Sequence, residues 1–179
     1  MIRVQEIATA VLFNLGEMYA RKHSDPELLE AINAVLRVVN MLLINRESNW
    51  IVKEMTLKVK NGKATLPSDF IKMKRMYATK DGQENLEYTG DFRIVKNTLY
   101  IDDTASKMDY YFIIDSVTSM EDEIDLPAIF LQLFIRYATG LLDGSIGKGG
   151  LDSLISEEIE NIAQSSNYPV IERPMEFWC

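Results

Sequence analysis

Few residues of this 179-residue chain have the chemistry of a catalytic or metal-binding centre. The chain contains one histidine, His23, and one cysteine, Cys179. His23 follows Lys22 in a polar stretch, so we expect it to be solvated. Cys179 could form an intermolecular disulfide or a metal contact, but an exposed terminal thiol in a cytosolic protein is usually unreactive. With so few nucleophiles and ligands, we predict that the protein is not an enzyme and holds no metal and no cofactor.

A glycine-rich stretch at residues 144–150, Gly-Ser-Ile-Gly-Lys-Gly-Gly, invites comparison with a phosphate-binding loop. The comparison fails at two positions. Leu142 stands where the first glycine should be, and Gly149 follows the lysine where serine or threonine is required. The segment before it has a helical pattern, whereas a phosphate loop follows a strand. We therefore interpret residues 144–150 as a flexible linker.

The densest acidic run is Glu-Asp-Glu-Ile-Asp at residues 121–125. It lacks the central glycine and the alternating oxygen ligands of a calcium loop. An acid–base pair would need a shielded cleft, which this pattern does not indicate. We interpret Asp125 as the N-cap of a helix and the rest of the run as solvated, with weak cation binding as the alternative.

Charge is distributed unevenly along the chain. The net charge is -8, which argues against a general nucleic-acid binder, because such binders neutralise phosphates. Residues 53–80 hold 8 basic and 2 acidic side chains, whereas residues 81–179 hold 6 basic and 19 acidic ones. This asymmetry suits a protein whose positive face docks on a negative face of another protein or of a second copy.

Two groups of residues are candidates for an interface. Basic side chains alternate through the central ribbon, where they form either a solvated face or a partner-facing patch. Aromatic residues in the C-terminal tail either fold back on their own subunit or lie on a neighbour as an exchanged arm, and two prolines with no helical period favour the arm. The candidate residues are Lys58, Lys60, Lys63, Lys72, Lys74, Arg75, Tyr168, Phe177 and Trp178.

Four segments carry a helical period. Apolar residues recur every three and four positions through residues 3–20, and Ser24 with Glu27 forms a capping box that begins a second helix, which ends near residue 45. The short connection predicts that these two helices pack as an antiparallel hairpin. A third helix follows Asp125, and a fourth covers residues 151–163.

The centre of the chain has the period of strands. Asn61-Gly62 favours a type I′ turn, so residues 55–66 are predicted to form a hairpin with Ala64 and Leu66 facing inward. Further strands are predicted at residues 71–79, 86–88, 92–95, 98–101 and 108–114. The predicted fold is α+β: a helical bundle of about four helices, one antiparallel β insertion between helices 2 and 3, and an extended C-terminal tail.

The expected domain limits follow from this layout. Residues 1–49 and 125–163 form the helical bundle, residues 50–124 form the β insertion domain, and residues 164–179 form an extended C-terminal arm. The longest uncharged apolar run, residues 126–135, is well short of the roughly 20 residues of a membrane span, and the N-terminus does not resemble a signal peptide. We therefore expect a soluble protein made in the cytosol, with no membrane partner.

The order of these motifs resembles the head–tail connector, or adaptor, proteins of tailed bacteriophages, of the tail tubular protein A and tail accessory factor type. The resemblance runs to about Ala163. It depends on a helix, a glycine turn followed by a Leu-Pro-Ser-Asp-Phe strand opening, a β region that ends in aromatic residues, and an Asp-Leu-Pro sequence before an apolar helix. These motifs are residues 30–36, 62–73, 110–112, 125–127, 130–131 and 137–142.

The resemblance implies a structural virion protein at the phage neck. Such proteins form rings, usually of twelve copies, that bind the portal protein, contact the tail or other neck proteins, and continue the channel through which DNA passes without sequence-specific binding. The expected location is the head–tail junction of the virion, and the host cytoplasm during assembly. The family supplies no catalytic residues. The alternative function is a monomeric module whose β insertion binds a small ligand or peptide.

Overall fold

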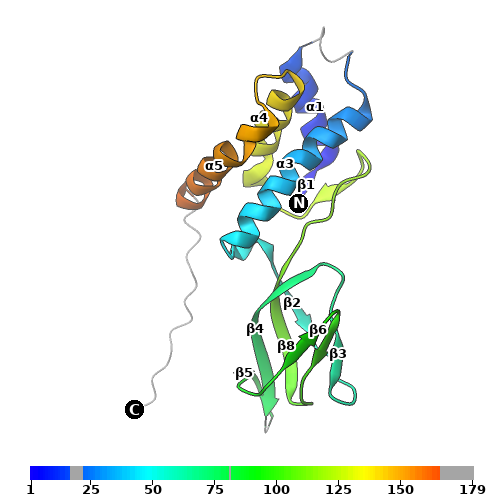
Figure 1. The fold of residues 1–179 in the computed structure, drawn as a ribbon, viewed down its shortest axis with the longest axis vertical. Coiled ribbons are helices and arrows are strands. Elements are labelled where there is room, and N and C mark those ends of the chain that lie inside the picture. The colour runs from blue at the N-terminus through cyan, green and yellow to red at the C-terminus, as the bar shows by residue number, and fades with distance from the viewer. Residues whose placement is uncertain (17–21, 81, 166–179) are drawn as a thin grey trace.

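The structure is a computed structural model that describes residues 1–16, 22–80 and 82–165. The protein is α+β, with the helices gathered at one end of the molecule and most of the strands at the other (Figure 1). Most of the predicted C-terminal arm, including Tyr168, Phe177 and Trp178, lies outside the described residues.

The described residues contain four α-helices and three short 3-10 helices. The predicted capping box marks the start of the second helix, at Asp25. The Ser24 backbone N–H donates to Glu27 Oε2 at 2.8 Å, and the serine side chain accepts from the Glu27 backbone N–H. This prediction is confirmed. The helices are α1 (Val4–Leu15), α3 (Asp25–Asn45), η1 (Asn49–Ile51), η2 (Ala128–Phe130), α4 (Leu131–Leu142), η3 (Lys148–Gly150) and α5 (Leu151–Ser165).

α4 is the central helix of the group. α1 and α3 each make their main helix contacts with α4, and α5 packs on α3 and α4. The predicted hairpin, in which the first two helices pack mainly on each other, is therefore wrong. Phe134 of α4 and Phe130, the last residue of η2, are both fully buried, and the buried residues of α4 occupy more than one side of the helix.

Gly140 allows the segment after α4 to fold back over the helix. The Ile146 backbone N–H donates to the Gly140 carbonyl oxygen at 2.9 Å, and a Cβ at residue 140 would come within 2.7 Å of Ile146 Cγ1. The segment that the sequence predicted to be a flexible linker, residues 144–150, therefore forms a turn followed by η3. Ile146, within this segment, packs against the hydrophobic core.

Gly140→Ala is expected to destabilise the protein, although alanine usually stabilises a helix by about 1 kcal/mol relative to glycine. The overlap with Ile146 should lower the free energy of unfolding by about 1–3 kcal/mol. In an Ile146→Gly background the overlapping atoms are gone, so Gly140→Ala should become stabilising. Urea unfolding of the four variants measures this change of sign, and a stabilising effect in both backgrounds would contradict it.

The strands form three antiparallel sheets. One has the order β2-β8-β4-β5, a second β3-β7-β6, and a two-stranded ribbon pairs β1 with β9. The buried side chains of the two larger sheets belong to the same hydrophobic core as the helices. The strands are β1 (Ile2–Arg3), β2 (Val52–Thr56), β3 (Lys63–Thr65), β4 (Phe70–Lys80), β5 (Gln83–Glu87), β6 (Arg93–Val95), β7 (Thr98–Tyr100), β8 (Ala105–Phe112) and β9 (Glu123–Ile124).

The predicted hairpin is only partly correct. Asn61 and Gly62 have φ angles of 51° and 70°, and Lys60 and Lys63 bridge across them, with Lys60 N–H to Lys63 O at 2.8 Å. Beyond this bridge, however, the strands separate. β2 pairs with β8 and β3 pairs with β7, so the two halves of the predicted hairpin lie in different sheets. Local alternation identified the strands but could not identify their partners.

The prediction of a helical bundle with a single β insertion is wrong. The ribbon of β1 and β9 belongs to the helical end, where Ile2 lies opposite Ile124 and both are buried. The Val4 N–H donates to the Asp122 carbonyl oxygen at 3.0 Å, so α1 begins directly from this ribbon. Two-residue strands carry no measurable period, which is why the sequence did not indicate them.

Asp125 does not cap a helix, contrary to the sequence prediction. α4 begins at Leu131, after η2, and the Asp125 carboxylate instead lies 3.4 Å from the Lys53 ammonium group. Asp122 is the residue of the acidic run that organises the backbone, because its Oδ2 accepts from the N–H groups of Thr118 and Ser119 at 2.7 and 2.9 Å. These bonds lower the pKa of the Asp122 carboxyl group.

Two asparagines of α3 hold the segment that leads from β8 back to the helices. Asn40 Nδ2 donates to Ile114 O at 2.9 Å, and Ile114 N–H donates to Asn40 Oδ1 at 3.1 Å. Asn33 makes the same pair of bonds with Val117, at 2.8 and 2.9 Å. Seven helical residues and three extended residues both span about 10 Å, so the two amides match the backbone repeat.

Candidate functional site

The structure divides the predicted basic patch into two groups. Lys72, Lys74 and Arg75 lie on β4, whereas Lys63 lies on β3 in the other sheet. Lys58 and Lys60 are exposed on the segment that leads from β2 to β3. One continuous basic ribbon is therefore not present, because β3 and β4 belong to different sheets.

The β4 lysines contact the segment that follows α3. Lys72 Nζ forms an ion pair with Glu47 Oε1, and the bond to Glu47 raises the pKa of Lys72. Lys74 Nζ donates to Asn49 Oδ1 and lies 5.9 Å from the centre of the Tyr111 ring. These two lysines therefore connect the larger sheet to the helical end, which makes them weaker candidates for an external partner.

Arg75 stands opposite Asp109 in the register of β4 and β8. Asp109 Oδ2 also accepts from the Tyr77 hydroxyl group at 2.8 Å, and burial together with this bond raises the pKa of Tyr77. On the same face, Lys107 Nζ lies 3.7 Å from Glu54 Oε1. Cross-strand pairs of opposite charge thus cover this face of the larger sheet.

The smaller sheet presents cations that lack such partners. Lys63, Tyr100 and Arg93 form one row across β3, β7 and β6. Lys63 Nζ lies 5.4 Å from the centre of the Tyr100 ring, and the Arg93 guanidinium carbon lies 5.0 Å from it. Within the described part of the chain, neither cation forms an ion pair.

Val95 lies two residues beyond Arg93 on the same side of β6, and its side chain is 42% exposed. We call Lys63, Arg93, Val95 and Tyr100 the cationic sheet face. Sequence reasoning identified only Lys63 of these four. In residues 93–95 and 98–100 the side chains alternate between the two faces of the sheet. The other three residues therefore lie on the face away from the buried Leu99, and this alternation could have identified them as one group from the sequence.

Lys53 joins the β strands to the approach to α4. Its ammonium group lies 3.2 Å from Asp69 Oδ2 and 3.7 Å from the centre of the Phe112 ring, in addition to its contact with Asp125. The Tyr110 hydroxyl group donates to Asp69 Oδ1 at 3.2 Å. Burial, with the charge of Asp69, raises the pKa of Tyr110 to about 12, so this phenol stays a neutral donor and serves as a structural contact.

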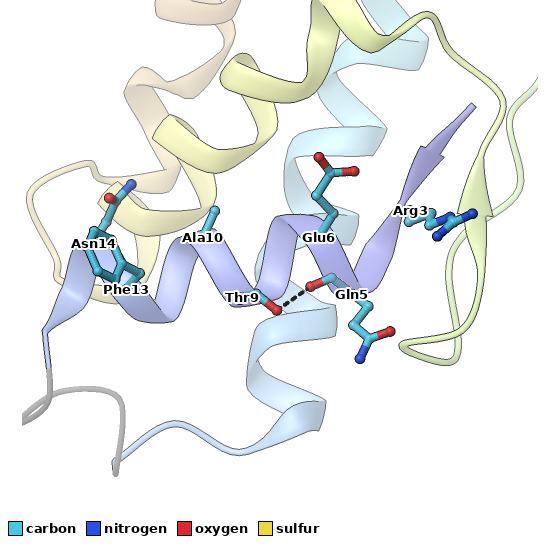
Figure 2. A pocket seen from close by; sticks show the side chains of 7 residues that line it. All are labelled: Arg3, Gln5, Glu6, Thr9, Ala10, Phe13 and Asn14. Carbon is cyan, nitrogen blue, oxygen red and sulfur yellow. Dashed lines mark hydrogen bonds between the residues drawn. The ribbon is translucent and has the colours of Figure 1, made fainter.

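An open groove of about 580 Å³ runs along the outer side of α1. Figure 2 shows its lining side chains, which all come from β1 and α1. Phe13 stands near one end and is 85% exposed, whereas Arg3 and Glu6 lie toward the other end. Because one helix supplies nearly the whole lining, none of the described residues outside β1 and α1 forms an opposite wall for the groove.

A smaller hollow of about 190 Å³ lies between the start of α3 and the end of α4. Ala31, Ala34 and Leu141 supply apolar walls, and His23 and Glu27 lie at its rim. The His23 side chain is only 16% exposed and its Nδ1 lies 3.9 Å from Glu27 Oε2, so the expectation that His23 is solvated is wrong.

Among residues 1–16, 22–80 and 82–165, no three His, Cys, Asp or Glu side chains lie where they could hold a metal ion together. In the same residues no helix has the length and apolar composition needed to cross a bilayer. No protein-family model matches the chain, and no curated protein matches it.

Proposed function

We propose that this chain is a structural virion protein that forms a ring at the neck of a tailed bacteriophage, joins the portal to the tail and continues the DNA channel. The observation that carries the proposal is the one-walled groove on α1 with Phe13 almost fully exposed. Burying a side chain of this size contributes about 1.5–3 kcal/mol, so a second polypeptide that supplied the missing wall would gain binding energy there.

The distribution of charge also supports a ring. In a closed ring each copy contacts the next through unlike faces, which must complement each other. The chain has a net charge of -8, yet its smaller sheet presents Lys63 and Arg93, which form no ion pair with any residue that the structure describes. An acidic surplus that lines the channel would repel DNA and let it slide.

Native mass measurement tests the proposal, with the purified protein alone and then mixed with the portal protein of the same phage. We expect a monomer alone and a ring of about twelve copies on the portal, because segments that become ordered on docking would complete the contacts between copies. Phe13→Asp should remain monomeric under both conditions, because it places a charge in the groove.

Met41→Asp is the matched control, since it places the same charge at an exposed apolar position of α3. It should assemble as the unmodified chain does. Assembly of Phe13→Asp would show that the groove is not an interface. If the unmodified chain formed no ring under any condition, or if the isolated subunit turned over a substrate, the proposed function would be wrong.

A further inference from the structure

α5 carries an excess of acidic side chains. Residues 151–165 contain four carboxylates and no lysine or arginine. Two of the carboxylates are engaged within the subunit: Glu158 Oε2 lies 2.9 Å from Arg136 Nη1, and Glu160 Oε1 lies 2.7 Å from Arg46 Nη2. These pairs hold α5 to α4 and to the end of α3, and they leave the outer side of the helix negative.

The outer side of α5 combines this charge with an exposed apolar residue. Leu154 is 41% exposed, and Glu157 follows it by three residues on the same side of the helix. Glu157 is exposed and forms no ion pair among the described residues. The Tyr137 hydroxyl group donates to the Leu154 carbonyl oxygen at 3.0 Å, so the helix is fixed in position before any partner arrives.

The cationic sheet face has the complementary pattern at a matching spacing. Val95 and Arg93 are alternate residues of one strand, about 7 Å apart, and Leu154 and Glu157 lie about 5–6 Å apart on the helix. Lys63 lies two strands from Arg93, about 10 Å away, and adds positive charge to the same face. One apolar pair and one ion pair can therefore form together, and Lys63 adds longer-range attraction to the acidic helix.

We propose that the cationic sheet face of one copy docks on the outer side of α5 of a second copy, with Val95 on Leu154 and Arg93 at Glu157. This inference rests on the proposed ring function, and it identifies the two surfaces through which neighbouring copies would join. In one subunit the surfaces cannot meet, because α5 packs on α3 and α4 at the helical end while the smaller sheet lies at the other end (Figure 1).

A second copy is favoured over nucleic acid for a physical reason. Single-stranded nucleic acids bind where bases can stack on open aromatic faces. The Tyr100 ring already has Lys63 on one side and Arg93 on the other, so a base has no free face to stack on. The exposed Val95 beside these cations suits a protein surface such as α5, and the phosphate backbone of DNA offers no apolar partner for it.

A charge exchange tests the contact in the portal-containing assembly mixture. Arg93→Glu and Glu157→Arg should each lose the ring, because each places like charges together at every contact. Mixing the two variants in equal amounts should restore the ring, since alternating copies again meet with opposite charges, and combining both changes in one chain should also restore it. Raising the salt concentration about tenfold should weaken these assemblies, because salt screens the attraction between exposed charges.

Two control variants carry the same charge changes elsewhere. Lys80→Glu lies near the end of β4 in the other sheet, and Asp152→Arg lies on α5 nearly one and a half turns before Glu157, so it faces away from the proposed contact. Both should assemble as the unmodified chain does. Normal ring formation by Arg93→Glu or Glu157→Arg alone would overturn the inference.

A cysteine pair separates this contact from ring closure. In a Cys179→Ser background, Val95→Cys with Leu154→Cys should give a ladder of oxidised oligomers, whereas either cysteine alone should stop at dimers. A ladder that ends at one size fits a ring, and an open-ended ladder would support the contact but contradict the ring. Rings without any Val95–Leu154 cross-link, with and without portal, would overturn the inference and leave the proposed function intact.

The same variants report on the competing occupant. If Arg93→Glu assembled normally but lost binding to duplex or single-stranded DNA, the cationic sheet face would be a nucleic-acid surface, and the docking on α5 would be wrong. We expect instead that DNA binding by the unmodified chain is weak and unchanged by Arg93→Glu.

Discussion

Asn40→Leu is expected to lower the free energy of unfolding by about 2–4 kcal/mol, although it replaces a buried side chain of α3 by another of similar size. Asn40 is 6% exposed, and its amide satisfies both the N–H and the carbonyl oxygen of Ile114. Leucine would leave both backbone groups buried without partners, and each such group costs about 1–3 kcal/mol. Urea unfolding monitored by circular dichroism measures the effect.

Asn33→Leu provides the matched control. Asn33 makes the same pair of bonds, to Val117, but it is only partly buried, so water can replace the lost partner. We expect a loss of about 1 kcal/mol or less. Equal losses for the two variants would show that burial does not decide the cost, and a loss below 1 kcal/mol for Asn40→Leu would contradict the clamp that these bonds form.

The helices were predictable because their signals are local. The Ser24–Glu27 capping box and the apolar period of α3 lie within a few residues of each other, and both are present in the structure. The backbone hydrogen bonds of Asn33 and Asn40 were not predictable, because these residues bond to residues 84 and 74 positions away. Nothing in the local sequence distinguishes an asparagine that bonds to a distant backbone segment from one on a solvated helix face.

The same limit applies to the interface residues. Alternation placed Lys58, Lys63 and Lys72 on strands, but it could not tell that Lys72 meets Glu47 while Lys63 lies beside Tyr100. Those neighbours depend on which strands pair, and strand pairing is set by the global fold. For this reason the sequence indicated the residue types, and only the structure separated the lysine that pairs with Glu47 from the lysine that lies beside Tyr100.

Phe130→Ala is expected to have the largest effect of a single truncation, a loss of about 3–5 kcal/mol in the free energy of unfolding. Phe130 is fully buried in η2, and its ring meets Trp50 of η1 edge to face, with centroids 4.8 Å apart and an interplanar angle of 88°. The contact therefore joins the segment that enters the strands to the segment that leads into α4. Ile129→Ala, at an exposed neighbouring position, should lose well under 1 kcal/mol.

A double-mutant cycle with Trp50→Ala separates the ring contact from the loss of buried volume. Edge-to-face pairs contribute about 0.5–1.5 kcal/mol beyond their buried area, so the two truncations should be non-additive by that amount. Because Phe130 lies between the helical end and the strands, its loss should destabilise both. The far-ultraviolet signal of the helices and the fluorescence of the tryptophans should then change in one transition. Two separate transitions in Phe130→Ala, with additive energies, would mean that this contact does not couple the two ends. The relative positions of α5 and the cationic sheet face would then depend on the other contacts between the ends, which are those of Lys53, of Lys72 and Lys74, and of Asn33 and Asn40.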